Sequence, residues 1–178
     1  MTEYTKGFDY EKAADHWTER DRKSSHMDDG RLKERIEGFI SKHNTGALAT
    51  ASGDFVRCTP IEYNYVDGFF YFFSEGGLKF RGLEDNKNVC FAIYEPYSGY
   101  ESLQSLQVMG SAEIVEPFND EYIKLLQHRR IPEEEFRKLP EPMNLIKVVP
   151  ESYDFLDSTL KDEGFGSRQH LEIIEKNV

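Results

Sequence analysis

Cysteine is scarce in this sequence of 178 residues, which contains only Cys58 and Cys90. Two cysteines are too few for a disulfide scaffold or for an all-cysteine zinc site. No window approaches the roughly 18 consecutive apolar residues that a membrane-spanning helix needs, so we expect no integral membrane protein. The first seven residues also lack the cationic start and apolar stretch of a secretory signal. These absences predict a protein of the reducing cytoplasm.

Positive charge is also in short supply, with 22 Lys and Arg against 33 Asp and Glu and a net charge of -11. A nucleic-acid-binding surface is normally basic, because phosphate neutralisation supplies most of its affinity. The composition therefore disfavours nucleic acid as a partner. An acidic chain can still hold a small anion where local cations and backbone N–H groups outweigh the overall field.

The 13% aromatic content and the length predict one folded domain.

Helical patterns are confined to the two ends of the chain and to a few short segments between strands. Residues 1–26 are polar and predict an arm or short helix, and Asp28 or Asp29 can cap a helix over about 31–43. The apolar stripe of that helix consists of Leu32, Ile36, Phe39 and Ile40. Further along, a helix opens near 78–83 and another runs from a cap at Asp120 to about Arg130. We expect 131–143 to be an exposed connection, and 160–178 to be a tail that packs on the rest of the chain.

Strand patterns fill most of the rest of the chain. Apolar runs and alternation predict strands at 47–51, 55–66, 69–73, 89–94, 106–115, 145–149 and 153–156. Asp67-Gly68 predicts a tight hairpin, since both residues tolerate positive φ. The run Phe69–Phe73 is apolar on both faces, so it is a central strand or is buried against a partner chain. The pattern indicates a mainly β fold, an antiparallel barrel of about six strands with peripheral α-helices.

The segment Ser74–Leu83 has the composition of an anion site. A strand ends in a hydroxyl residue, two glycines follow, and Lys79 and Arg81 stand in the first turn of the next helix. Helix N-termini and cations favour a phosphate, but the same segment also fits an ordinary surface turn with solvated cations. Both interpretations remain open on the residues alone.

Arg57 can reach the same anion if its strand pairs with the next across Asp67-Gly68, because Arg57 and Lys79 then lie near one end of the hairpin. Pro60 removes one ladder hydrogen bond and marks an edge or bulged position. Backbone groups at such an edge are free to bind a flat heterocycle.

Residues 43–116 resemble the flavin-mononucleotide-binding split-barrel superfamily, in particular its pyridoxamine 5'-phosphate oxidase-like branch. The resemblance rests on the order of an Arg-headed strand, a short hairpin, an aromatic strand ending in Ser, a Gly/Lys turn, and the later run Val108-Met109-Gly110-Ser111-Ala112-Glu113. It implies a six-stranded antiparallel split β-barrel of the FMN-binding type, which occupies 1–178 with an N-terminal helical arm (1–45) and a C-terminal tail (157–178).

The resemblance also implies FMN as the cofactor and a homodimer with two flavin sites at its interface. Arg57, Lys79 and the hydroxyl of Ser74 would hold the flavin phosphate, and Ser105 would come from the partner subunit. The residues implied to contact the cofactor are Arg57, Cys58, Thr59, Pro60, Ile61, Ser74, Lys79, Phe80 and Ser105. Five residues after Arg57, where oxidases of pyridoxamine phosphate have a lysine, this chain has Glu62. That charge reversal predicts a different substrate from the one in the family's name.

The leading functional hypothesis is therefore a flavin-dependent oxidoreductase of a small organic molecule, and the alternative is a non-catalytic flavin or haem binder, for example a sensor. The five histidines are far apart in the sequence and lack ligand spacing, so we expect them to be structural or surface residues and predict no metal site. None stands out as an axial haem ligand, which favours flavin. Cys58 and Cys90 are expected to be small buried strand residues. Catalytic residues are not identified by any motif.

Overall fold

The computed structural model describes residues 8–173, so the first seven residues of the expected arm and the last five of the expected tail lie outside the described residues. In chain order the elements are α1 (Tyr10–Asp21), α2 (Asp29–Ser41), β1 (Thr45–Ser52), β2 (Phe55–Glu62), β3 (Asn64–Val66), β4 (Phe69–Ser74), α3 (Lys79–Gly82), β5 (Asn88–Tyr94), the 3₁₀ turn η1 (Tyr100–Ser102), β6 (Gln104–Val115), α4 (Asp120–His128), α5 (Glu133–Arg137), β7 (Asn144–Asp157), the 3₁₀ turn η2 (Ser158–Glu163) and β8 (Arg168–Glu172). No helix in this part of the chain is long and apolar enough to cross a membrane.

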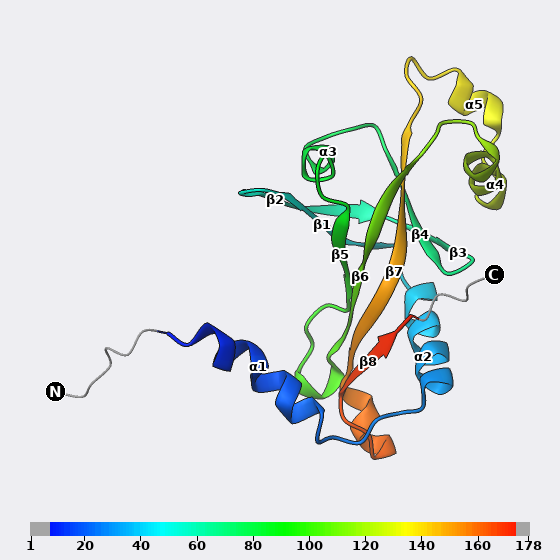
Figure 1. The fold of residues 1–178 in the computed structure, drawn as a ribbon. Coiled ribbons are helices and arrows are strands. Elements are labelled where there is room, and N and C mark those ends of the chain that lie inside the picture. The colour runs from blue at the N-terminus through cyan, green and yellow to red at the C-terminus, as the bar shows by residue number, and fades with distance from the viewer. Residues whose placement is uncertain (1–7, 174–178) are drawn as a thin grey trace.

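The eight strands between residues 8 and 173 belong to one antiparallel sheet with the order β2-β1-β5-β6-β7-β4-β3, and β8 pairs with β7. Two long strands, β6 and β7, run the length of the molecule and twist across one another (Figure 1). β4 pairs with residues 144–148 of β7 and β8 with residues 152–156, so the two short strands share one edge of β7. The sheet curls into the antiparallel split barrel that the sequence predicts.

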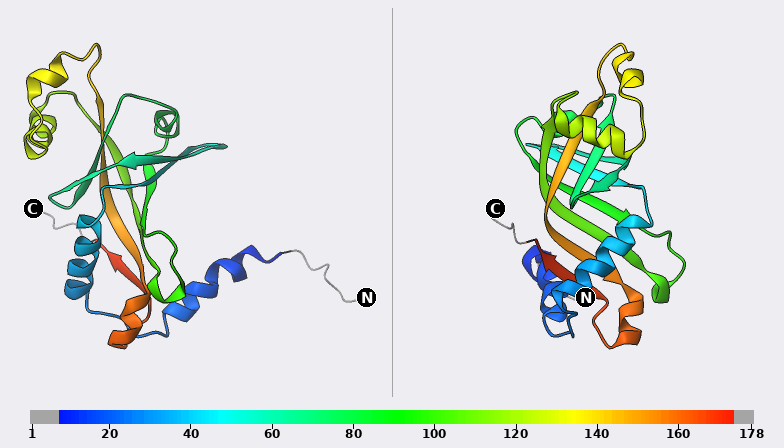
Figure 2. Two further views of the ribbon diagram at one scale, coloured as in Figure 1. Left: turned by 180° about the vertical axis from the view of Figure 1, so that it is seen from behind. Right: turned by 90° about the vertical axis from the view of Figure 1, so that its right-hand side faces the viewer.

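The barrel interior is built from one face of each strand and is closed by α2. Phe70, Phe72 and Phe91 are fully buried there. The stripe of α2 faces the same core, with Leu32, Ile36, Phe39 and Ile40 all buried, and Asp28 caps the helix by accepting a hydrogen bond from Arg31 N. This confirms both the predicted stripe and the predicted cap. Figure 2 shows α2 lying across the end of the barrel near β8.

The aromatic strand β4 is central, as expected, because it lies between β3 and β7. Its second face, with Phe69, Tyr71 and Phe73, packs in a separate cluster with α4 and α5. The apolar residues on both faces therefore find partners within the chain. The segment 131–143, expected to be a bare connection, contains the short helix α5, whose Phe136 ring lies 5.3 Å from that of Phe73.

Two strand boundaries differ from the prediction. The predicted strand 55–66 breaks at Tyr63, which turns inward: its N–H donates to Asn44 O and its hydroxyl donates to Ile40 O. At this corner the chain leaves β1 and begins to pair with β4. The predicted strands 145–149 and 153–156 are instead one strand: Pro150 pairs with Gly110 and Ser152 with Met109, and a bulge at Glu151 between them lets the strand continue past the proline.

The two ends of the described chain differ in how they pack on the barrel. The C-terminal segment forms β8 and packs on the body, as the tail was expected to do. Helix α1 has no buried residue and extends away from the barrel (Figure 1). Its contacts with the body include Trp17, over whose ring the Arg168 guanidinium lies at 4.6 Å.

Candidate anion site at the β4–α3 turn

The turn between β4 and α3 lies against the β1–β2 hairpin. Helix α3 has only four residues and is shorter than its sequence suggested. Gly82, at the end of α3, packs directly against Thr50 of β1. A Cβ atom on Gly82 would lie 2.4 Å from Thr50 Oγ1, so only glycine lets α3 approach this closely. Thr50 is paired with Arg57 in the β1–β2 ladder. The contact therefore places α3 beside Arg57.

Arg57 and Lys79 meet by this route and not by the pairing that the sequence suggested. β2 pairs with β1, whereas only the three residues of β3 pair with β4 across Asp67-Gly68. That turn has the expected positive φ values, 53° and 87°. The contact of Gly82 with Thr50, the ladder partner of Arg57, brings the two cations near each other. Burial first and the charge of Arg57 second lower the pKa of Lys79.

Lys79 is 7% exposed, and its ammonium group donates to the carbonyl oxygen of Gly76. Within residues 8–173, neither Lys79 nor Arg57 has a carboxylate at ion-pair distance. Two adjacent cations without an acidic partner are unusual in a chain with a net charge of -11. Buried charges are normally paired, so the buried ammonium of Lys79, with the exposed Arg57 beside it, is suited to an anion that comes from outside the chain.

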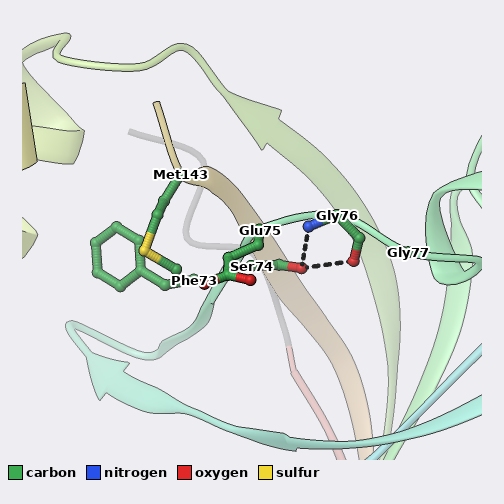
Figure 3. Close-up of a pocket in the computed structure, with 6 residues that line it drawn as sticks. All are labelled: Phe73, Ser74, Glu75, Gly76, Gly77 and Met143. Atoms are coloured by element: carbon green, nitrogen blue, oxygen red, sulfur yellow. Dashed lines mark hydrogen bonds between the residues drawn. The ribbon is translucent and has the colours of Figure 1, made fainter. Parts of the chain in front are cut away.

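Ser74 completes the cluster from the end of β4. Its hydroxyl donates to Gly76 O over 2.9 Å and accepts from Gly76 N over 3.1 Å, as the dashed lines in Figure 3 show. A hollow of about 590 Å³ opens beside this turn and is lined by Phe73, Ser74, Glu75, Gly76, Gly77 and Met143. The hydroxyl of Ser74 and the ammonium of Lys79 therefore converge on one oxygen atom at the rim of an open hollow.

The residues expected along β2 divide between its two faces. Thr59 and Ile61 share the inward face with Arg57, and Ile61 packs against the barrel core. Cys58 and Pro60 lie on the outward face and are exposed, so the expectation of a buried Cys58 is wrong. Cys90 is half-buried, and burial is the first of the causes that raise its pKa. β2 is an edge strand, as Pro60 indicated, so one row of its backbone groups is unpaired.

Phe80 and Ser105 have different relations to the cluster. The Phe80 ring lies 5.3 Å from the Lys79 ammonium and packs against the core, which fixes the turn. Ser105 pairs with Tyr94 at one end of β5, whereas Arg57 is linked through Thr50 to Val89 at the other end. The five residue steps of β5 from Val89 to Tyr94 therefore separate Arg57 from Ser105 by about 17 Å along the strand direction. Within one chain, Ser105 is therefore remote from the anion cluster.

Glu62, the residue that reverses the charge of a family position, forms an ion pair. Its carboxylate lies 3.1 Å from the Arg129 guanidinium at the end of α4. The negative charge of Glu62 is therefore compensated within the chain.

A second hollow, of about 760 Å³, lies between α1 and the ends of β6, β7 and β8, and pattern reasoning from the sequence missed it. Ser105 is part of its lining, together with Trp17, His26, Arg168 and His170. His170 Nδ1 lies 2.7 Å from Asp154 and its Nε2 lies 3.1 Å from Glu172. The hydrogen bond with Asp154 is the first of the causes that raise the pKa of His170. No sequence spacing predicts this group, because it joins segments about 150 residues apart.

His43 is structural: Nδ1 contacts Phe39 O at 2.8 Å and Nε2 contacts Glu95 at 3.1 Å. Among residues 8–173, no group of three or more His, Cys, Asp or Glu side chains is placed to hold a metal ion.

The structure is a split barrel with a cationic turn, a candidate anion site, close to an edge strand. The sequence pattern of the pyridoxamine 5'-phosphate oxidase family matches residues 32–157, and the chain belongs to that family. No curated protein matches the chain.

Three solved structures illustrate the range of proteins with this fold. An FAD-binding protein from Mesorhizobium loti is 20% identical with a TM-score of 0.56, over 68% of this chain and 89% of that one. Campylobacter jejuni ChuZ is 18% identical with a TM-score of 0.62, over 93% and 69% of the two chains. The heme storage protein HutZ from Vibrio cholerae is 18% identical with a TM-score of 0.56, over 67% and 90%. At these identities the likeness shows the fold.

Proposed function

We propose that this protein binds FMN and acts as a flavin-dependent oxidoreductase on a small organic molecule. The observation that carries the proposal is the pair of cations Arg57 and Lys79, which lie together without a carboxylate partner in the described chain. A terminal phosphate supplies the missing negative charge, and Ser74 adds a hydroxyl. Charged hydrogen bonds of this kind contribute about 1.5–3 kcal/mol each.

The rest of the cofactor has a place beside the phosphate. The unpaired edge of β2 continues from Arg57 through Cys58, Thr59, Pro60 and Ile61, and its free N–H and C=O groups suit the edge of a flat heterocycle. When bound, the flavin supplies hydride chemistry, and the chain supplies its position and surroundings.

The site is proposed to form in a homodimer. Val56, Tyr94 and Met109 are exposed on the outward face of β2, β5 and β6, where a second copy would bury them. A second copy would also bring Ser105 and the hollow beside α1 to a flavin held by Arg57 and Lys79 of the first.

Glu62 supports a substrate other than pyridoxamine phosphate. A lysine at this position would offer a substrate phosphate one cation, whereas the ion pair of Glu62 with Arg129 is close to neutral and offers no net positive charge.

The proposal is tested by the visible spectrum of the purified protein, with mass identification of the bound molecule. We expect flavin bands, or uptake of FMN on reconstitution, and bleaching of those bands by reduced nicotinamide or another donor. Protein that stays colourless after incubation with FMN would refute the flavin site. Flavin that binds but is not turned over by any donor and acceptor pair would leave a binding protein in place of an enzyme.

The alternative, a haem binder, is favoured by one observation. His170 lines the hollow of about 760 Å³ and its Nδ1 is hydrogen-bonded to the Asp154 carboxylate, an arrangement common for metal-binding histidines. Its Nε2, which lies 3.1 Å from Glu172, would have to leave that carboxylate to bind iron. A Soret band on addition of hemin that is lost in His170→Ala would support this alternative, and an unchanged hemin spectrum would exclude it.

A further inference from the structure

The peptide between Gly76 and Gly77 presents the wrong atom to an anion. Its carbonyl oxygen accepts hydrogen bonds from both Ser74 Oγ and Lys79 Nζ. An incoming phosphate oxygen would need those same two donors. The Gly76 carbonyl therefore occupies the position that the proposed function assigns to the anion.

Both neighbouring peptides are held by hydrogen bonds of their own, whereas the 76–77 peptide is held only through its carbonyl oxygen, by the two donors that the anion would take over. Gly76 N, in the preceding peptide, donates to Ser74 Oγ, and Gly77 O, in the following peptide, accepts from Phe80 N over 3.2 Å. The Gly77 N–H, on the far side of the peptide from the Gly76 carbonyl, has no acceptor among the described residues. The 76–77 peptide can rotate about its two flanking bonds without breaking either of the neighbouring hydrogen bonds.

We propose that the 76–77 peptide rotates when the anion binds, so that the Gly77 N–H replaces the Gly76 carbonyl in the site. The rotation turns an acceptor that competes with the anion into a third donor for it. It also gives the Lys79 ammonium a full negative charge as its partner in place of a carbonyl dipole. This inference rests on the proposed anion site and adds Gly77 to the groups that hold the ligand.

Only glycine at position 77 allows both orientations of the peptide, because the orientation with the carbonyl in the site needs a positive φ. Gly77 has a φ of 108°, a value that other residues avoid. A half-turn of the 76–77 peptide changes ψ of Gly76 and φ of Gly77. It brings φ of Gly77 to about -70°, a value that any residue adopts without strain. The φ of Gly76, 148°, does not change in this motion. An alanine at 77 would thus oppose the carbonyl-in state and favour the anion-binding state.

The test compares Gly77→Ala with Gly76→Ala and Lys79→Ala, each titrated with FMN and with riboflavin, which lacks the phosphate. A Cβ on Gly77 would lie 3.5 Å from Lys79 Nζ, an ordinary contact, so the substitution acts through φ and not through a clash. We expect Gly77→Ala to bind FMN about ten-fold more tightly than wild type. Its affinity for riboflavin should be unchanged, and Gly76→Ala should show no gain for either ligand.

The outcomes separate this inference from the site on which it rests. If Lys79→Ala loses FMN affinity but Gly77→Ala shows no gain, the anion site stands and the rotating peptide is overturned. If Lys79→Ala binds FMN as wild type does, the anion site and the rotation both fail. A second measurement needs no variant: in ¹⁵N-labelled wild type, the Gly77 amide should shift downfield and exchange more slowly on saturation with FMN. An unchanged Gly77 amide in FMN-saturated protein also overturns the rotation.

Discussion

Arg35 on α2 and Asp157 at the end of β7 form a two-pronged ion pair, with Nε and Nη2 of the guanidinium 3.2 Å and 3.1 Å from one carboxylate oxygen. Asp157 is fully buried, and its other oxygen accepts from the N–H and the hydroxyl of Thr159. The pair fastens the helix that closes the barrel to the end of its longest strand.

Replacing Asp157 by Ala should destabilise the fold by about 3–5 kcal/mol at pH 7, because it leaves two Thr159 donors without their acceptor and leaves the Arg35 guanidinium with only the more exposed Glu163 as a carboxylate partner. Chemical denaturation of wild type and variant measures the difference. Glu163→Ala is the control, since Glu163 also contacts Arg35 but is more exposed, and we expect it to cost less than about 1 kcal/mol. Equal losses in the two variants would contradict a special role for the buried pair.

The same pair predicts an acid dependence. Burial alone would raise the pKa of Asp157, but hydrogen bonds, from Thr159 first, more than offset it and lower that pKa. The stabilisation is therefore present above the unfolded-state value of about 3.9 and is lost as the pH falls through the folded-state value. Wild type should lose more free energy of unfolding than Asp157→Ala between pH 5 and pH 3.

Much of this fold is readable from local patterns, because they depend on neighbours in the chain. The stripe of α2 and the turn at Asp67-Gly68 need only a helical period and two residues that tolerate positive φ. The break at Tyr63 and the unbroken run of β7 through Pro150 depend on partners far along the chain, Ile40 and Gly110. Pattern reasoning does not reach such contacts.

The candidate site divides in the same way. Arg57, Ser74 and Lys79 could be selected from their residue types and order, although the pairing expected to join them was wrong. What brings Arg57 to Lys79 is the contact of Gly82 with Thr50, which no periodicity indicates. The hollow beside α1 joins segments from the two ends of the chain, and no local signal marks it.

Arg57→Ala and Lys79→Ala should each weaken FMN binding by about ten-fold or more, from the loss of a charged hydrogen bond. Fluorescence titration with FMN measures the change, and Lys138→Ala, which removes an exposed lysine paired with Glu135, should leave the affinity unchanged. Without ligand, Arg57→Ala should be no less stable than wild type, because the charge of Arg57 disfavours the charged form of Lys79. Wild-type FMN occupancy in both variants after dialysis would refute the assignment.

Gly82→Ala should lower both stability and FMN affinity, since its Cβ would lie 2.9 Å from the backbone carbon of Thr50 as well as 2.4 Å from Thr50 Oγ1. Helix α3 would have to move off β1 and carry Lys79 away from Arg57. Gly38→Ala on α2 is the matched control, because no atom lies within 4 Å of its added Cβ, and we expect it to stabilise by about 0.5–1 kcal/mol. A Gly82→Ala protein with unchanged affinity would show that the packing of α3 does not position the site.

His170 predicts a weak dependence of stability on neutral pH. Its pKa is raised, by the hydrogen bond with Asp154 first and with Glu172 to a lesser degree, against an opposing effect of burial. A raised folded-state pKa stabilises the fold below the unfolded-state value of about 6.5, and the stabilisation is lost as the pH rises through the folded-state value. Because the His170 side chain is 50% exposed, we expect the effect to be below about 1 kcal/mol.

Thermal unfolding at pH 6 and pH 8 should show a smaller difference in stability between the two pH values for His170→Gln than for wild type. His16→Gln, which changes an exposed histidine on α1, should leave the wild-type difference intact. If His170→Gln also retains that difference, Asp154 does not hold the proton of His170 in solution.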